Sequence, residues 1–480
     1  MISVRSRRPV ISVFAALFFI FELLTLVHAA EIPPIEPFEK SDRVLIVSPH
    51  PDDDIIACAG VIQRALASGA KVKVVYITCG DNNIGSVFLY TDLPLILCRN
   101  KIFYLVELIM SWRERFAALG RIRIDEAIRA QKILGLNESD LVFLGYPDHG
   151  TDQMFIFNWD HTKPYSYSLG GYSSVPYEKG LRGGRVYTAD NIIDDLKGII
   201  EEFKPTKIFV AHSSDVNGDH WASYLYTLVS LSDLSGAVPA PKIYPYIVHV
   251  PDWPLPRNYH PNLPIEPPEK FFGGILPLIE WRQLKLTPQE IEKKHEAMKM
   301  HESQMYVSAF YLLSFVRKNE IFGDFPTIVL KRQDPSRMSE DEDLFTADMK
   351  WIGYAVVDDS LWVRVRQSED ADEGMDLTFF IAGMKSGVEF AKMPNIMVTA
   401  FNNKLSIYNS TEDRYVSPVG ASLEVDQDWV TLKIPLEALG DPQSLIFGLE
   451  TDAQHIPEGC TAFRIIKIEE MQPANGQKNI

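Results

Sequence analysis

The sequence has little cysteine: four residues in 480, with no CxxC pair among them. This scarcity argues against a zinc ribbon and against a disulfide scaffold. Basic residues are also fewer than acidic ones. The sequence has 47 Lys and Arg and 64 Asp and Glu, which gives a formal net charge of -17. Since phosphate binding needs clustered Lys and Arg, this balance argues against a nucleic-acid surface.

The first thirty residues have the pattern of a targeting segment. Three arginines precede an apolar run over residues 10–27, and small residues suited to cleavage follow it. We expect residues 1–30 to be a signal peptide. The run contains Glu22 and is near the lower length limit for a membrane span, so an uncleaved anchor that contacts the membrane is the alternative. Either form predicts an exported chain: periplasmic, secreted or at the cell surface.

The length predicts two folded domains, because one ordinary core does not extend over 480 residues. Between residues 41 and 325, short β-rich runs alternate with helical patterns, as in parallel βαβ units. We therefore predict an α/β domain with a Rossmann-like, mostly parallel sheet and helices on both faces. The expected strands are 43–47, 72–77, 141–144, 207–211 and 242–250. The expected helices are one that the aspartates after His50 begin and that runs to about residue 67, and those at 123–134, 189–203, 221–231, 288–300 and 305–318.

Two stretches of this domain do not have a regular pattern. Residues 84–112 are unusually apolar, and we expect them to be buried against the sheet; a lid or a lipid-facing patch is the alternative. Residues 151–185 are rich in glycine and aromatic residues without periodicity, which is typical of a long binding loop.

Residues 326–344 have the composition of a charged linker, and residues 345–475 alternate apolar and polar positions with period two. Short strands between Gly, Asn, Asp and Pro turns predict an antiparallel β-sandwich. Trp351, Trp362 and Trp429 are either core residues of that sandwich or aromatic surfaces that stack on sugar rings.

The candidate site begins at Pro-His-Pro-Asp-Asp-Asp, residues 49–54, between the first strand and its helix. These aspartates can cap the helix. The same turn, in an open α/β sheet, faces the crevice where ligands bind. Other polar clusters also follow predicted strands, and they include His149, His212 and His249, each of which can equally be an ordinary core or surface histidine.

Two imidazoles and one carboxylate from His50, Asp53 and His220 form a suitable three-point set for Zn²⁺, with a fourth position left for water. Spacing alone does not select His220, but its position directly after Asp219 at a helix start does, since Asp219 can support the local geometry from outside the ligand set. Asp52 stays free to remove a proton from the water.

The segment from Val44 to Gly60 resembles the PIG-L/LmbE-like family of zinc-dependent N-deacetylases, and further matches extend over about residues 41–325. Asp54 stands where the family usually has Glu. The resemblance implies that His50, Asp53 and His220 bind the metal and that Asp52 is the general base.

The second family motif ends in Asp-His, and Asn217 stands where many members carry a catalytic histidine. An amide can donate a hydrogen bond to an oxyanion but cannot act as an imidazolium acid, so Asp52 would return the proton to the leaving amine. By the same resemblance, Arg123 and Asp148 are candidates to bind sugar hydroxyls; for Arg123 an ion pair on the helix surface is the alternative.

The resemblance implies removal of an N-acetyl group from an N-acetylglucosamine-type sugar or glycoconjugate. The C-terminal domain weakly resembles carbohydrate-binding modules, which implies glycan binding there. Two other functions remain open: a catalytically silent glycan-binding protein, and a metal-dependent amidase or esterase that acts on a substrate other than a sugar.

Overall fold

The computed structural model describes residues 32–90, 101–160, 162–166, 169–269, 272–273, 276–277, 279–332, 339–340, 349–367, 376–401, 404–452 and 463–469, with side chains left undescribed at some segment ends. The targeting segment predicted for residues 1–30 lies outside them. Among the helices that are described, none has the length and apolar content needed to cross a bilayer.

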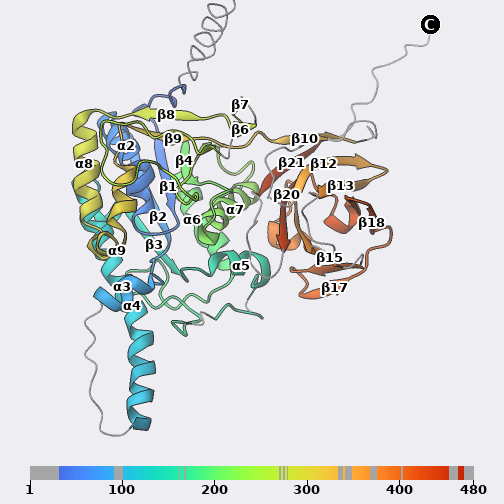
Figure 1. The fold of residues 1–480 in the computed structure, drawn as a ribbon, viewed down its shortest axis with the longest axis horizontal. Coiled ribbons are helices and arrows are strands. Elements are labelled where there is room, and N and C mark those ends of the chain that lie inside the picture. The colour runs from blue at the N-terminus through green and yellow to red at the C-terminus, as the bar shows by residue number, and fades with distance from the viewer. Residues whose placement is uncertain are drawn as a thin grey trace, which may run out of the picture.

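The first domain is built on a five-stranded parallel sheet in the order β3-β2-β1-β4-β5 (Figure 1). Its strands are β1 (Arg43–Ser48), β2 (Lys71–Thr78), β3 (Leu141–Tyr146), β4 (Lys207–Ala211) and β5 (Lys242–Tyr246). The strand order reverses between β1 and β4, and the strands are buried almost throughout. This confirms the predicted Rossmann-like fold class. The buried free thiols of Cys58 and Cys79 belong to this core.

Helices cover both faces of this sheet. Their bounds are α2 (Asp53–Ala67), α3 (Ile84–Tyr90), α4 (Lys101–Leu134), α5 (Thr151–Phe157), α6 (Ala189–Phe203), α7 (Gly218–Asp233), α8 (Pro288–Lys299) and α9 (Glu302–Leu312). The helices α2, α4 and α8 pack together, and α7 packs with α5 and α6. Because right-handed crossovers run in opposite directions from β1 and from β4, these two groups lie on opposite faces. A small antiparallel pair, β8 (Arg282–Lys285) and β9 (Asn319–Phe322), completes the domain together with the short strands β6 (Phe272–Gly273) and β7 (Leu276–Pro277).

Several predicted boundaries are wrong, and most of the differences have local causes. The helix predicted at 123–134 is the last third of α4, and part of the predicted loop after Gly150 is helix α5. Helix α9 ends at Leu312 rather than near residue 318, after a non-helical backbone at Ser308. Strand β5 ends at Tyr246, and soon after it the backbone N–H groups of Val248 and His249 donate to the Asp215 side chain instead of to a neighbouring strand.

The apolar stretch 84–112 is only partly described. Val87 is buried as expected, but Ile84 and Phe88 are 49% and 60% exposed, so the prediction of a buried cover is wrong for these two residues. The side chains of residues 89–111 lie outside the described part of the chain. The backbone of α4 projects from the body of the domain at its N-terminal end, at the bottom of Figure 1.

The second domain is a β-sandwich, as predicted. One sheet has the order β10-β21-β20-β14-β15-β16-β17, and the other has the order β11-β12-β13-β19-β18. Its strands are β10 (Ile328–Lys331), β11 (Ser339–Glu340), β12 (Met349–Val357), β13 (Ser360–Gln367), β14 (Asp376–Met384), β15 (Asn395–Phe401), β16 (Lys404–Asn409), β17 (Arg414–Val416), β18 (Ser422–Asp426), β19 (Trp429–Pro435), β20 (Ser444–Asp452) and β21 (Arg464–Glu469). Strand β10 lies inside the segment expected to be a linker and pairs in parallel with β21, whereas the other pairings are antiparallel.

The three tryptophans of the sandwich are half-buried on the outer face of the β12-β13-β19 sheet, where Trp362 lies four positions along β13 from the residue opposite the other two. Side chains along β13 point alternately to the two faces of its sheet. Leu361, Val363 and Val365 are therefore buried between the sheets, while Trp362 faces outward. Trp351 and Trp429 meet edge to face at 5.3 Å, and the Arg364 guanidinium lies 4.1 Å from the centre of the Trp429 ring. The indole surfaces are thus partly occupied by neighbouring side chains.

The two domains share a hydrophobic contact. Phe390 of the sandwich packs on Trp159, with ring centres 5.3 Å apart, and Phe463 packs on Trp221 at 4.7 Å. The Phe390 backbone N–H donates to Asp233 at the end of α7. The sandwich is therefore packed against the helices that follow β3 and β4.

Candidate metal and substrate site

The candidate site lies where the strand order of the parallel sheet reverses. His50 and Asp53 follow β1, and His220 lies in the first turn of α7, directly after β4 and its loop. Because β1 and β4 are neighbours and run parallel, their carboxyl ends deliver these three side chains to one crevice. His50 and His220 are 170 positions apart in the sequence, and the pairing of β1 with β4 brings them together.

Three possible ligand atoms lie close together, one each from His50, Asp53 and His220. Asp53 Oδ2 lies 3.1 Å from both His50 Nδ1 and His220 Nε2, and the two nitrogens are 3.3 Å apart. One ion about 2 Å from each atom would touch all three, which is the bond length that zinc takes with nitrogen and oxygen. The donor set and its spacing fit Zn²⁺, in agreement with the set predicted from the sequence.

Buried carboxylates hold the other nitrogen of each imidazole. His50 Nε2 lies 3.1 Å from Asp148 Oδ1 and 3.2 Å from Asp219 Oδ2, and His220 Nδ1 lies 3.1 Å from Asp215 Oδ2. Such contacts fix the ring orientation and keep the inner nitrogen available to a metal. The expected support from Asp219 is present, but it acts on His50 rather than on its neighbour His220.

The electrostatics also favour a cation at this place. Burial lowers the pKa of the His220 imidazole, but Asp215 and Asp53 outweigh it and raise the pKa to about 9. Burial acts on His50 in the same way, yet Asp148 and Asp219 hold the pKa of His50 well above its usual value. Burial raises the pKa of Asp53, but the two histidines bring it well below the ordinary range. The surrounding carboxylates therefore stabilise positive charge among the three ligand atoms.

Asp52 stands beside the ligands and is held by Arg123. The Arg123 guanidinium donates to Asp52 Oδ1 at 2.9 Å and to the carbonyl oxygens of Pro51 and Gly80, both at 2.8 Å. Burial raises the pKa of Asp52 to about 7 against the opposing charge of Arg123. The surface ion pair considered for Arg123 is wrong, since this side chain is buried and bonded to the turn that carries Asp52.

The expected helix-capping role of these aspartates is wrong for Asp52. Its side chain makes no capping hydrogen bond, and its backbone has φ 145°, a value that non-glycine residues rarely adopt. Strained backbone of this kind is found at functional sites, where the surroundings hold it in place. Asp54, in contrast, is turned into the core, where Tyr76 and Gln131 donate to its carboxylate.

A cavity of about 280 Å³ opens onto these groups. It is lined by His50, Asp52, Asp53, Ile56, Asn83, Arg123, Asp148, His149, Asn217, His249, Gln304, Ser308, Tyr311 and Leu312. Asn217 caps α7 by accepting from the Asp219 backbone N–H through Oδ1 at 2.9 Å, so its amide NH₂ remains available as a donor. All eight predicted site residues therefore either line the cavity or, like His220 and Asp219, lie directly behind its wall.

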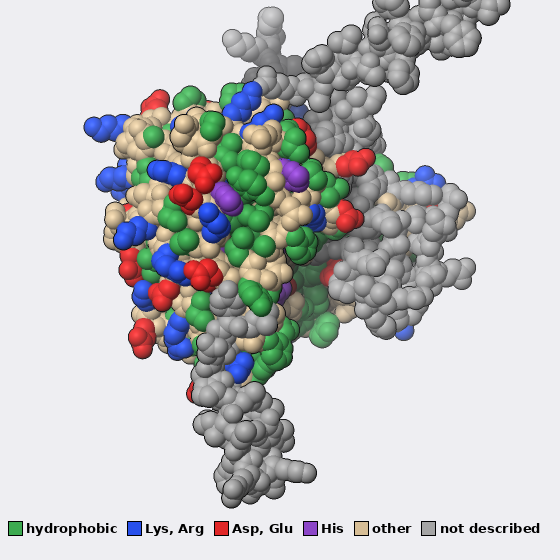
Figure 2. All heavy atoms as spheres, turned by 60° about the vertical axis from the view of Figure 1, so that its left-hand side comes forward, with side chains coloured by type: hydrophobic (Ala, Val, Ile, Leu, Met, Phe, Trp, Pro, Cys, Tyr) green, Lys and Arg blue, Asp and Glu red, His purple; other side chains and the backbone are tan. Residues whose placement is uncertain are grey.

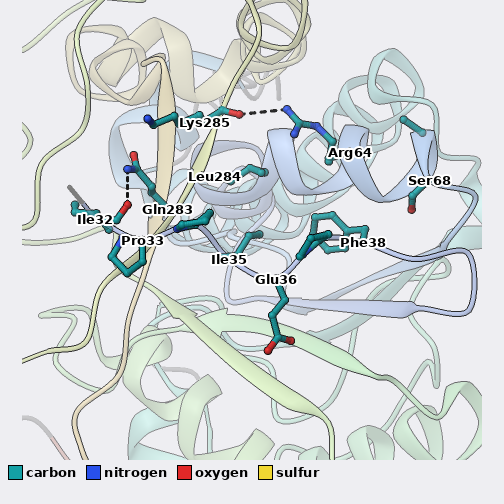
Figure 3. Close-up of a pocket in the computed structure, with 13 residues that line it drawn as sticks. Ile32, Pro33, Ile35, Glu36, Phe38, Arg64, Ser68, Gln283, Leu284 and Lys285 are labelled. Carbon is teal, nitrogen blue, oxygen red and sulfur yellow. Dashed lines mark hydrogen bonds between the residues drawn. The ribbon is translucent and has the colours of Figure 1, made fainter.

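A larger cavity, about 750 Å³, lies at the other end of α2 between residues 32–38 and β8 (Figure 3). Gln283 and Arg64 there donate to the carbonyl oxygens of Ile32 and Lys285. Its lining is mostly apolar and contains no histidine or cysteine. On the side of the α/β domain turned forward in Figure 2, acidic and basic side chains are interspersed with hydrophobic ones.

Sequence reasoning missed Asp215, a buried residue in the loop between β4 and α7. In addition to His220, its carboxylate accepts from the backbone N–H groups of Asn217 at 3.0 Å, Val248 at 3.1 Å and His249 at 2.8 Å. Asp215 thus joins a metal-ligand candidate to two residues of the cavity wall. The one local signal was an Asp two residues before a helix cap, and that pattern is common in turns.

The chain is similar in sequence to proteins of a known family. Residues 45–229 match the family model described as PIG-L: GlcNAc-PI de-N-acetylase. The chain is 27% identical over 334 residues to a 1D-myo-inositol 2-acetamido-2-deoxy-alpha-D-glucopyranoside deacetylase of Kribbella flavida, an alignment that covers 63% of this chain and 97% of that protein.

Two solved deacetylases also align with the chain. One is the N,N'-diacetylchitobiose deacetylase of Pyrococcus horikoshii, at 17% identity and TM-score 0.33, covering 64% of this chain and 89% of that one. The other is the teicoplanin deacetylase Orf2 in its zinc-inhibited form, at 16% identity and TM-score 0.32, covering 57% and 88%. The match to the family model carries the assignment: residues 45–229 form a PIG-L family domain. A β-sandwich follows this domain in the chain.

Proposed function

We propose that the chain is an exported, zinc-dependent hydrolase that removes the N-acetyl group from an N-acetylglucosamine-type sugar or glycoconjugate. The observation that carries the proposal is the set of three ligand atoms within 3.3 Å of one another, with Asp52 beside them in one cavity. The PIG-L match and the deacetylase of Kribbella flavida support an amino-sugar substrate.

His50, Asp53 and His220 would hold the zinc ion, which supplies Lewis acidity towards water and towards the amide carbonyl. Asp52 then takes the proton of the attacking water, and Arg123 keeps its carboxylate in place. When the C–N bond breaks, Asp52 returns that proton to the departing nitrogen. The products are acetate and a free amine.

Asn217 donates from its amide NH₂ to the carbonyl oxygen as negative charge develops there. The capping bond to the Asp219 backbone fixes which way the amide faces, so the donor is in place before reaction. Arg123, whose contacts are to protein groups, positions Asp52 and does not bind a sugar hydroxyl in this proposal. Asp148, which lines the cavity beside His50, retains that role through Oδ2, which also accepts from the Asn82 backbone N–H at 2.8 Å.

Export rests on the arginines and the apolar run of residues 1–30, with cleavage or anchoring as the two forms. For the sandwich we propose that it holds glycan near the catalytic domain. N-terminal sequencing of the mature protein tests the first proposal, and retention of the full chain on glycan columns, with Trp362→Ala as the variant, tests the second.

The deciding experiment measures bound zinc and acetate release from methyl N-acetylglucosaminide and larger N-acetylglucosaminides. We expect one zinc per wild-type chain and acetate release that Asp52→Asn lowers at least 100-fold. Asp324→Asn is the matched control, since Asp324 is also a hydrogen-bonded carboxylate, is partly buried and lies outside the cavity.

Wild type that carries zinc but releases no acetate from any of these sugars would overturn the proposal. If it then hydrolyses non-sugar amides or esters, it is a hydrolase of another class. If it binds the sugars without turnover, it is a glycan-binding protein. Near-normal turnover in Asp52→Asn would show that Asp52 is not the base.

A further inference from the structure

His249 is a histidine of the cavity that the proposed mechanism does not use. It follows β5, lines the cavity, and its ring lies edge to face with that of His220, with centres 4.6 Å apart. The other histidine of the lining that lies outside the ligand set, His149, has a side chain that is 59% exposed. His249 is therefore the better placed of the two to make a defined contact with a substrate.

Three contacts fix the position of His249. Its backbone N–H donates to Asp215 at 2.8 Å, and its carbonyl oxygen accepts from the Val216 backbone N–H at 3.2 Å. Its ring lies nearly parallel to that of Tyr311, with centres 5.9 Å apart and an angle of 10°. The imidazole is thus held on the wall next to the α7 cap that carries Asn217.

The contact with Tyr311 indicates which ring nitrogen carries the hydrogen. The Tyr311 hydroxyl donates to the Val248 carbonyl oxygen at 2.7 Å, so its single hydrogen is already used. Its oxygen lies 3.4 Å from His249 Nδ1 and can only accept there, which places the ring hydrogen on Nδ1. Nε2 of the neutral ring then keeps its lone pair, and within the described residues it has no hydrogen-bond partner.

We propose that His249 is a specificity-determining residue whose Nε2 accepts a hydrogen bond from the N–H of the substrate's acetamido group. This inference rests on the proposed function and narrows its substrate to secondary amides. In the proposed mechanism Asn217 meets the carbonyl oxygen of this amide, and His249, on the same cavity wall, meets its N–H. An ester has no N–H and gains nothing from His249, because a site that is built to bond a polar group discriminates strongly against an analogue that lacks it.

The test compares two substrates that differ at this group: methyl N-acetylglucosaminide and the corresponding 2-O-acetyl glucoside. We expect His249→Ala to lower kcat/KM for the amide 10- to 100-fold and for the ester less than threefold, with bound zinc unchanged. His249→Gln, whose side-chain oxygen can accept the same bond, should recover part of the loss for the amide.

Equal losses for the two substrates, or no loss for the amide, would overturn the inference while leaving the deacetylase proposal intact. Wild type that hydrolyses the ester and not the amide would overturn both. If neither substrate turns over, calorimetric binding to zinc-loaded Asp52→Asn decides: the inference requires tighter binding of the amide than of the ester, and loss of that preference with His249→Ala.

Discussion

Charged and aromatic side chains gather at two places in this molecule, and they are arranged differently. At the switch point of the parallel sheet, each imidazole lies between a shared inner carboxylate, Asp53, and its own outer carboxylates. On the outer face of the sandwich, each cation lies on an indole instead, with Arg364 and Arg366 over Trp429 and Lys433 over Trp362. The first cluster is buried and converges on one point, whereas the second is half-exposed and spread along strands.

This difference indicates which of the two clusters could hold a cation. Cross-strand pairs between cations and indoles stabilise a sheet by themselves. Three ligand atoms pressed within 3.3 Å of one another in a buried, acidic setting are satisfied best by a cation. The two regions should therefore respond in opposite ways to mutation: the first through metal content and activity, the second through modest changes in stability.

The largest expected effect follows from removing one ligand. His220→Ala should lower zinc affinity at least 100-fold and acetate release at least 1,000-fold, because two ligands hold zinc poorly. Metal analysis after dialysis and an acetate assay measure the two quantities. Trp429→Ala is the contrasting variant and should keep both at the wild-type level; retention of zinc by His220→Ala would contradict the ligand assignment.

Asp215→Asn should have the next largest effect. An amide can accept from the backbone N–H groups of Val248 and His249, but it pairs less well with the His220 ring, so we expect zinc affinity to fall about 10- to 100-fold. Competition with a chelator measures the affinity. Asp324→Asn controls for general loss of stability, and equal zinc affinities for the two variants would show that Asp215 only supports the fold.

Asp215 also shows where sequence reasoning stops. His50 and Asp53 are three residues apart in the turn after the first strand. Their closeness in space can therefore be predicted from the local sequence. Asp215, Val248 and His249 meet only because β4 and β5 are paired, and Arg123 reaches Asp52 from a helix 71 residues away. Buried contacts of this kind depend on the packed fold, and composition or periodicity does not contain them.

The same reasoning explains the errors in the fold. Alternating patterns located the five parallel strands and the sandwich, because burial on one or both faces imposes a period on the sequence. Ile84 and Phe88 were expected to be buried because they are apolar, yet both are exposed. Strand β10 looked like part of a charged linker, and only its pairing with β21 makes it a strand.

A smaller effect concerns the pH dependence of stability near the contact between the domains. Burial raises the pKa of Asp324 from 3.8 to about 6, although Tyr224 donates to its carboxylate. Between about pH 4 and 6 the folded chain keeps this proton and the unfolded chain loses it, so stability falls as pH rises through that window. The full difference is of order 2 to 3 kcal/mol.

Urea unfolding of wild type and Asp324→Asn at pH 4, 5, 6 and 7 gives the free energy of unfolding of each. The change with pH in the difference between the two free energies measures the contribution of Asp324. The variant should lose less stability than wild type between pH 4 and 6, and the two curves should run parallel above pH 6. Parallel curves over the whole range would mean that Asp324 has an ordinary pKa. His220→Ala, which acts at the buried cluster, should not remove this particular slope.

The smallest effect is expected on the sandwich face. Arg364→Ala removes a guanidinium 4.1 Å from the Trp429 ring, and half-exposed contacts of this type contribute about 0.5 to 1 kcal/mol. We expect a loss of that size in urea unfolding of the sandwich and no change in zinc content or acetate release. Arg366→Ala, which also gives up its 2.7 Å ion pair with Asp428, provides the matched comparison, since that pair is partly exposed and adds little. A loss of several kcal/mol from Arg364→Ala would mean that this face is organised as tightly as the buried cluster of His50, Asp53 and His220.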